Sequence, residues 1–146
     1  MTAQLSMAHL IAAPVLVPLV AAGLMLWLGE KRRRARAAIA LLSCLALLGL
    51  AIALLAWVDA GDAPGAFGVY LPGNWPVPFG IVLVADRLSA LMLVLAALTG
   101  LATLLYSLAR WHRGGVHFHP LLQLQLMGLN GAFLTADLFN LFVFFE

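Results

Sequence analysis

The chain has 146 residues, of which 64% are hydrophobic and only 10% are charged. A soluble domain carries about 25% charged residues, and one core of this size could not bury so much apolar surface. The net charge of +2 gives no electrostatic basis for binding nucleic acid, and the single cysteine, Cys44, excludes a disulfide framework. The composition therefore predicts an all-α membrane protein, a single transmembrane unit over residues 1–146.

Apolar segments follow one another along the chain and predict about four complete transmembrane helices plus the start of a fifth. A crossing helix needs roughly 20 apolar residues. Pro14 and Pro18 fall inside the first segment, which membrane helices tolerate where neighbouring helices supply hydrogen-bond partners. Asp137 marks a tight turn before the last helix, which is incomplete. The predicted spans are residues 5–28, 38–58, 81–109, 120–136 and 138–146.

The loops divide into basic and non-basic ones. Residues 30–36 and 110–115 are rich in Lys and Arg, whereas residues 59–80 and the turn at Asp137 contain neither. By the positive-inside rule, the N-terminus lies on the periplasmic side and the basic loops in the cytoplasm. The Gly, Pro and Asp residues of 59–80 predict a short hairpin-like loop over the periplasmic membrane surface.

Glu146 is the only acid in the apolar run that follows Asp137. Nine residues of helix carry it about 13 Å from Asp137, near the middle of a bilayer. A carboxyl group in hydrocarbon is costly when charged, and by default it marks a proton or ion site. Glu146 is therefore the candidate group for proton translocation. The alternative is an acid that only bonds a neighbouring helix.

A polar stripe is predicted on the fourth span. Gln123, Asn130 and Asp137 are seven residues apart and share one helix face, and His119 lies one turn before Gln123. Two interpretations remain open for these side chains: a hydrated proton path towards Glu146, or hydrogen bonds that hold helices together. Gly128 and Gly131 add a small-residue surface for close helix packing.

Two further groups of polar residues give weaker indications of a functional role. Asp86 and Arg87 are adjacent, so they do not face each other on a helix, and they are candidates for positioning neighbouring helices. His117 and His119 could serve proton entry or cap a helix. Two histidines do not complete a zinc site, so no metal site is predicted.

Two stretches carry a resemblance to a known family. Residues 79–92 read FGIVLVADRLSALM, and residues 117–146 read HFHPLLQLQLMGLNGAFLTADLFNLFVFFE. They resemble the D subunit of the multisubunit Na⁺/H⁺ antiporters (Mrp, also called Pha or Mnh), which is similar to the proton-pumping subunits of respiratory complex I. The resemblance covers the whole chain and is strong from about Trp75 onward.

The resemblance implies that the chain is an N-terminal fragment of a longer secondary transporter subunit, not of an enzyme. Glu146 matches the glutamate that the family carries on its fifth helix, where a lysine on the seventh helix pairs with it. Lys31, the only lysine here, lies in a loop and does not match that partner. The resemblance further implies other subunits of a hetero-oligomeric antiporter as partners, H⁺ and Na⁺ as transported ions, no cofactor, and the bacterial inner membrane.

Two other hypotheses stay open. A proton-pumping membrane-arm subunit of complex I, or of a membrane-bound hydrogenase, shares the glutamate on helix five. The amino-acid sequence of residues 125–135 favours the antiporter over these redox complexes. A short membrane scaffold without transport is the third hypothesis, and the half-built last helix disfavours it.

Overall fold

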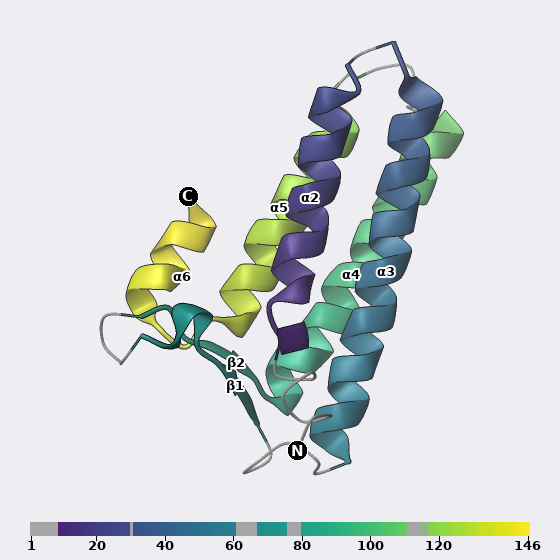
Figure 1. The fold of residues 1–146 in the computed structure, drawn as a ribbon. Coiled ribbons are helices and arrows are strands. Elements are labelled where there is room, and N and C mark those ends of the chain that lie inside the picture. The colour runs from purple at the N-terminus through teal and green to yellow at the C-terminus, as the bar shows by residue number, and fades with distance from the viewer. Residues whose placement is uncertain (1–8, 30, 61–66, 76–79, 111–114, 116) are drawn as a thin grey trace.

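The computed structural model describes residues 9–146 except 30, 61–66, 76–79, 111–114 and 116 (Figure 1). Helices dominate the described chain, as the composition predicts. Figure 1 shows α2 to α5 side by side as a bundle, with α6 on the outer side of α5. Within the bundle, α2 packs mainly against α5, and α3 mainly against α4. The α-helices are α2 Ala13–Trp27, α3 Arg33–Asp59, α4 Arg87–Arg110, α5 Phe118–Leu134 and α6 Leu138–Phe145.

A small antiparallel hairpin lies across one end of the bundle (Figure 1). Strand β1, Gly68–Tyr70, pairs with β2, Leu83–Ala85, with Gly68 opposite Ala85. A 3₁₀ turn, η2 Pro72–Asn74, lies between the strands. The sequence predicted a hairpin-like loop in residues 59–80. The structure adds that its second strand comes from residues expected to be helical.

The boundaries of the helices differ most from the predicted spans at the starts of α3 and α4. Helix α4 begins at Arg87 and not near residue 81, because Leu83 and Ala85 alternate inward along β2. Helix α3 begins at Arg33 and not at residue 38, so part of the predicted basic loop forms its first turn. The predicted start of the first span at residue 5 and most of the basic connection at 110–115 lie outside the described residues.

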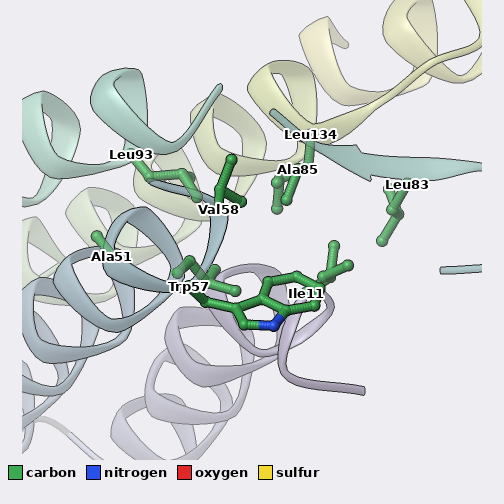
Figure 2. Packing of buried hydrophobic residues seen from close by; sticks show 9 residues of the cluster. Ile11, Ala51, Trp57, Val58, Leu83, Ala85, Leu93 and Leu134 are labelled. Atoms are coloured by element: carbon green, nitrogen blue, oxygen red, sulfur yellow. The ribbon is translucent and has the colours of Figure 1, made fainter. Parts of the chain in front are cut away.

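The hairpin is fixed to the bundle by a cluster of buried apolar side chains. Trp57, near the end of α3, packs with Ile11, Leu83 and Leu134 in this cluster (Figure 2). A Cβ atom on Gly68 would meet the Trp57 ring, so only glycine lets β1 come this close. A second cluster, around Met25 and Cys44, fills the other end of the bundle.

The outward surfaces of the helices are apolar. Two of the described helices, Arg33–Asp59 and Arg87–Ala109, are long and apolar enough to cross a membrane, and Ala13–Trp27 is a shorter apolar helix. Helix α5 has 17 residues, at the short end of the range that spans a bilayer. Large side chains such as Leu42, Leu91 and Phe139 remain exposed, which suits contact with lipid or other helices.

Candidate functional site

Glu146 ends helix α6 and lies at the surface of the described chain. Its backbone N–H donates to the carbonyl of Phe142 at 3.2 Å, so it continues the helical hydrogen bonding. The side chain is exposed, and it borders an open hollow of about 410 Å³ together with Gln125 and Gly128 of α5. The predicted turn at Asp137 and the following helix are therefore present, and they bring Glu146 back beside α5.

Helix α6 starts at a hydrogen-bonded junction. Asp137 caps the helix, because its carboxylate accepts from the backbone N–H of Phe139 at 3.1 Å. The buried side chain of Asn140 donates to the hydroxyl of Thr135 at 3.1 Å. The N–H of Ala136 donates to the carbonyl of Val82 at 3.0 Å, which ties the junction to the hairpin. These bonds set the direction in which α6 leaves α5.

Two glycines let α6 approach α5 closely. A Cβ atom on Gly131 would overlap the ring of Phe144, and one on Gly128 would stand 2.9 Å from the carbonyl oxygen of Phe144. Both approaches are too close for an alanine without movement. The predicted small-residue surface is confirmed, and its partner is the helix that carries Glu146.

Two polar residues of α5, Gln123 and Asn130, are buried against α3 and α2. Gln123 is fully buried; it accepts from the hydroxyl of Ser43 at 2.9 Å and donates to the carbonyl of Ala40 at 3.2 Å. Asn130 donates to the carbonyl of Pro14 at 2.9 Å. These bonds match the helix-contact interpretation for both residues.

The bond from Asn130 has a specific cause in the sequence. In an α-helix the carbonyl of Pro14 would accept from the N–H four residues later, but that residue is Pro18, which has no N–H. Asn130 supplies the missing donor from the neighbouring helix. A neighbouring helix thus supplies a partner to the proline-containing helix, which is the condition under which membrane helices tolerate proline.

The four residues of the predicted stripe do not form one face. Helix α5 ends at Leu134, and Asp137 belongs to the start of α6, so its inclusion in the stripe was wrong. The chain turns at Thr135, which takes an extended backbone conformation. Gln123 and Asn130 contact α2 and α3, whereas Glu146 lies beside Gln125 and Gly128, on another side of α5.

Asp86 and Arg87 each have a separate partner. Asp86 precedes the membrane helix α4; the backbone N–H of Ser89 donates to its carboxylate at 2.6 Å, and this bond holds the pKa of Asp86 below its ordinary value. Arg87 forms an exposed ion pair with Asp59 at 3.1 Å, which links the start of α4 to the end of α3. The positioning role expected for the pair agrees with these contacts. Asp59 had no signal in the sequence beyond its place in a loop.

Arg36 is the functional candidate that the sequence analysis missed. It was grouped with the basic loop, yet only 3% of its surface is exposed. Its Nε donates to the carbonyl of Met25 at 2.8 Å, across the α2–α3 connection. His119 lies near it, on α5, and both line one cavity. The spacing of Arg36 from Ala40 and Cys44, both on the buried face of α3, is the signal that could have revealed it.

No group of three or more His, Cys, Asp or Glu side chains that could hold a metal ion occurs within the described part of the chain.

Several bacterial proteins are similar to this chain in sequence. The chain is 54% identical over 140 residues to a probable K⁺/H⁺ antiporter D subunit of Rhizobium meliloti, covering 94% of the chain and 26% of that protein. It is 36% identical to a Na⁺/H⁺ antiporter D subunit of Alkalihalophilus pseudofirmus, covering 96% of the chain and 28% of that protein. A shorter match, 43% over 81 residues, is to the N subunit of NADH-quinone oxidoreductase of Desulforudis audaxviator, covering 53% of the chain and 16% of that protein.

The fold has a solved counterpart in the Mrp complex from Dietzia, with a TM-score of 0.78 and 31% identity, covering 99% of this chain and 25% of that one. No protein-family model matches the chain. The chain spans about a quarter of the length of the antiporter relatives. The likeness runs over nearly the whole chain: in sequence it is to D subunits of cation/proton antiporters, and in fold it is to a chain of the Mrp complex.

Proposed function

We propose that the chain is the N-terminal transmembrane part of a subunit of a monovalent cation/proton antiporter and contributes to proton translocation. The observation that carries this proposal is the likeness to antiporter D subunits over nearly the whole chain. A secondary transporter subunit needs no covalent catalysis, and the described residues offer proton-binding and hydrogen-bonding groups. Its partners are the other subunits of the hetero-oligomeric antiporter, the lipid bilayer, and the transported ions.

The proposed topology keeps about four complete membrane spans and the start of a fifth. The proposed spans are residues 5–28, 38–58, 81–109, 120–136 and 138–146. Within them, the helices begin and end at the residues given for α2 to α6. The N-terminus and the hairpin face the periplasm, and the basic loops face the cytoplasm of a bacterial inner membrane. The exposed apolar surfaces of the long helices support this arrangement.

Glu146 is the proposed proton-binding group. It is the acid that the last apolar helix carries, and it stands beside the polar side chain of Gln125 at an open hollow. His119, Gln123, Asn130 and Asp137 are supporting positions. The hydrogen bonds of Gln123 and Asn130 favour helix contact as their main role.

The transported cation is Na⁺ or K⁺. The relative with 54% identity is named for K⁺, and the relative with 36% identity is named for Na⁺. Any assay of function must therefore test both ions.

The test is the Glu146→Gln variant in the complete subunit, assembled with its partner subunits in everted membrane vesicles. Glutamine keeps the size of the side chain and removes the titrating proton. We expect the pH change driven by added Na⁺ or K⁺ to be lost, while the amount of assembled complex is unchanged. Asp59→Asn serves as the control, because that exposed acid belongs to an ion pair at the start of α4. Unchanged cation-driven pH change in Glu146→Gln would remove Glu146 from the proton path.

A membrane-arm subunit of complex I is the second candidate, favoured by the match to the N subunit of NADH-quinone oxidoreductase. The same vesicles separate the two functions. An antiporter subunit supports a pH change when only cation is added, whereas a redox-driven pump needs an electron donor and a quinone. A pH change that requires NADH and ignores the cation would favour the redox complex.

A further inference from the structure

A basic cavity of about 190 Å³ lies at the end of the bundle where α3 and α5 begin. Arg33, Arg34 and Arg36 line it from α3, and His119 lines it from α5. The volume is far above the roughly 10–15 Å³ that one buried water requires. The described lining contains no carboxylate. A cavity of this size and charge suits an anion larger than a halide.

The helix ends at the cavity add to its positive potential. An α-helix N-terminus carries a partial positive charge and is normally stabilised by an acidic side chain or a polar cap. Helix α3 has neither a side-chain cap nor an acid in its first turn, and Arg33 and Arg34 occupy that turn. Helix α5 also begins without a side-chain cap or an acid. The positive ends of the two helices and the arginine side chains therefore lie together, and a bound anion would be stabilised by them.

A buried side chain independently indicates a ligand. His119 is only 8% exposed, and its Nδ1 is buried without a hydrogen-bond partner among the described residues. Buried nitrogen atoms of this kind are normally paired, so an unpaired one at a cavity indicates an absent acceptor or donor. Arg36 is held in place beside it, because its Nε donates to the carbonyl of Met25. The cavity wall therefore includes a guanidinium group that is held in place and an imidazole whose buried Nδ1 has no partner among the described residues.

We propose that this cavity binds the phosphate group of an anionic phospholipid. Arginine binds phosphate oxygens with its planar guanidinium, and basic hollows between membrane helices on the cytoplasmic side are suited to lipid headgroups. The cavity wall also includes Leu108 of α4, one turn beyond the exposed Leu105. The phosphate would lie among the arginines while the acyl chains follow the apolar outer surface of α4.

The test measures lipid binding to the purified complex that contains the complete subunit, after delipidation in neutral detergent. Native mass spectrometry follows the addition of phosphatidylglycerol, with phosphatidylcholine as the zwitterionic comparison. The first variant is Arg33→Gln with Arg34→Gln, which removes two exposed charges at the cavity. The matched control is Lys31→Gln with Arg32→Gln, which removes the same charge from two neighbouring residues that do not line it.

We expect the Arg33/Arg34 variant to weaken phosphatidylglycerol binding by about tenfold and the Lys31/Arg32 control to change it less than about threefold, since each nearby cation adds to headgroup affinity. A third variant, His119→Leu, leaves the formal charge unchanged if the imidazole is neutral, and it should weaken binding by a few-fold. Equal losses in the two double variants would overturn the proposal, because they indicate only general attraction to the basic loop.

Inorganic phosphate separates the two sources of a phosphate group. It is added without lipid and then as a competitor against phosphatidylglycerol. We expect millimolar phosphate to leave the bound lipid in place, because it lacks the acyl chains that contact α4. Displacement of the lipid by phosphate, with the same dependence on Arg33 and Arg34, would overturn the lipid assignment and indicate a site for a free anion.

Discussion

The hydrogen bond from Asn130 to the carbonyl of Pro14 allows a direct test of how α5 packs against α2. We predict that Asn130→Leu destabilises the chain and that Pro18→Ala removes most of this effect. In the present sequence, Asn130 is the donor from outside α2 to the carbonyl of Pro14. Alanine at position 18 restores a backbone N–H, which can donate to that carbonyl within the helix. Leucine has the branched shape of asparagine without its hydrogen-bonding groups, and its larger volume is the same whether residue 18 is proline or alanine.

The magnitude follows from the bonds that change. A hydrogen bond between membrane helices contributes about 0.6 kcal/mol on average and up to about 1.7 kcal/mol. A buried carbonyl left without a partner costs about 1–3 kcal/mol. The Oδ1 atom of Asn130 is itself buried without a partner among the described residues, so its removal offsets part of the loss. We therefore expect Asn130→Leu to lower the free energy of unfolding by about 1–2 kcal/mol when residue 18 is proline, and by less than about 0.5 kcal/mol when residue 18 is alanine.

The measurement is a double-mutant cycle on the free energy of unfolding, obtained by SDS titration in mixed micelles. The four proteins are the unchanged chain, the two single variants and the double variant. The coupling energy isolates the link between positions 130 and 18 from their separate effects. Gln125→Leu is the control, because that residue is on α5 but exposed. A coupling energy of zero within error would show that Asn130 does not replace the donor missing at Pro18.

The glycine contacts and the cap at Asp86 lead to two more expected outcomes. Gly131→Ala should lower the free energy of unfolding by about 1–3 kcal/mol, and Phe144→Ala should restore most of this loss because it removes the ring that the new Cβ atom meets. Phe144→Ala should not rescue Gly128→Ala, because there the new Cβ atom meets the backbone of Phe144. Gly49→Ala is the control in the same titration, since a Cβ atom at that position meets nothing within 4 Å. The lowered pKa of Asp86 contributes stability that is complete above its ordinary value of 3.8 and is lost as pH falls through the lowered value. Because the carboxylate is exposed, solvent screening keeps this contribution small. An Asp86→Asn variant should remove the acid-dependent loss in thermal unfolding from pH 5 to pH 2.

The sequence predicted features that depend on composition and on local pattern. The apolar helices, the turn at Asp137 and the close packing of Gly128 and Gly131 were all predicted. Each depends on residues close together in the chain, or on a helix face that periodicity defines. Helix limits were less accurate, because Leu83 and Ala85 are apolar in a strand as they would be in a helix. Short apolar runs do not distinguish the two.

The partners of polar residues were not predictable in the same way. The sequence marked Gln123 and Asn130 as a polar stripe but could not say that they bond α3 and α2. Arg36 looked like part of a basic loop because its neighbours are exposed, and only the packing of α3 reveals that it is buried. The ion pair between Asp59 and Arg87 joins two residues on either side of the hairpin. Such pairs depend on which helices are neighbours in space, and single-sequence periodicity does not contain that information.

The position of Glu146 depends on contacts at both ends of α6. Most of α6 is exposed in the described chain, but Phe144 packs closely against Gly128 and Gly131 of α5. The start of α6 is held by the bonds around Thr135 and by the N–H of Ala136, which donates to Val82 beside β2. A movement of the hairpin must either break that backbone bond or carry the start of α6 with it. Because α6 rises about 1.5 Å per residue, a tilt at Asp137 moves Glu146 by roughly 2 Å for every 10°. The hairpin is therefore mechanically linked to the carboxyl group that the proposed function requires.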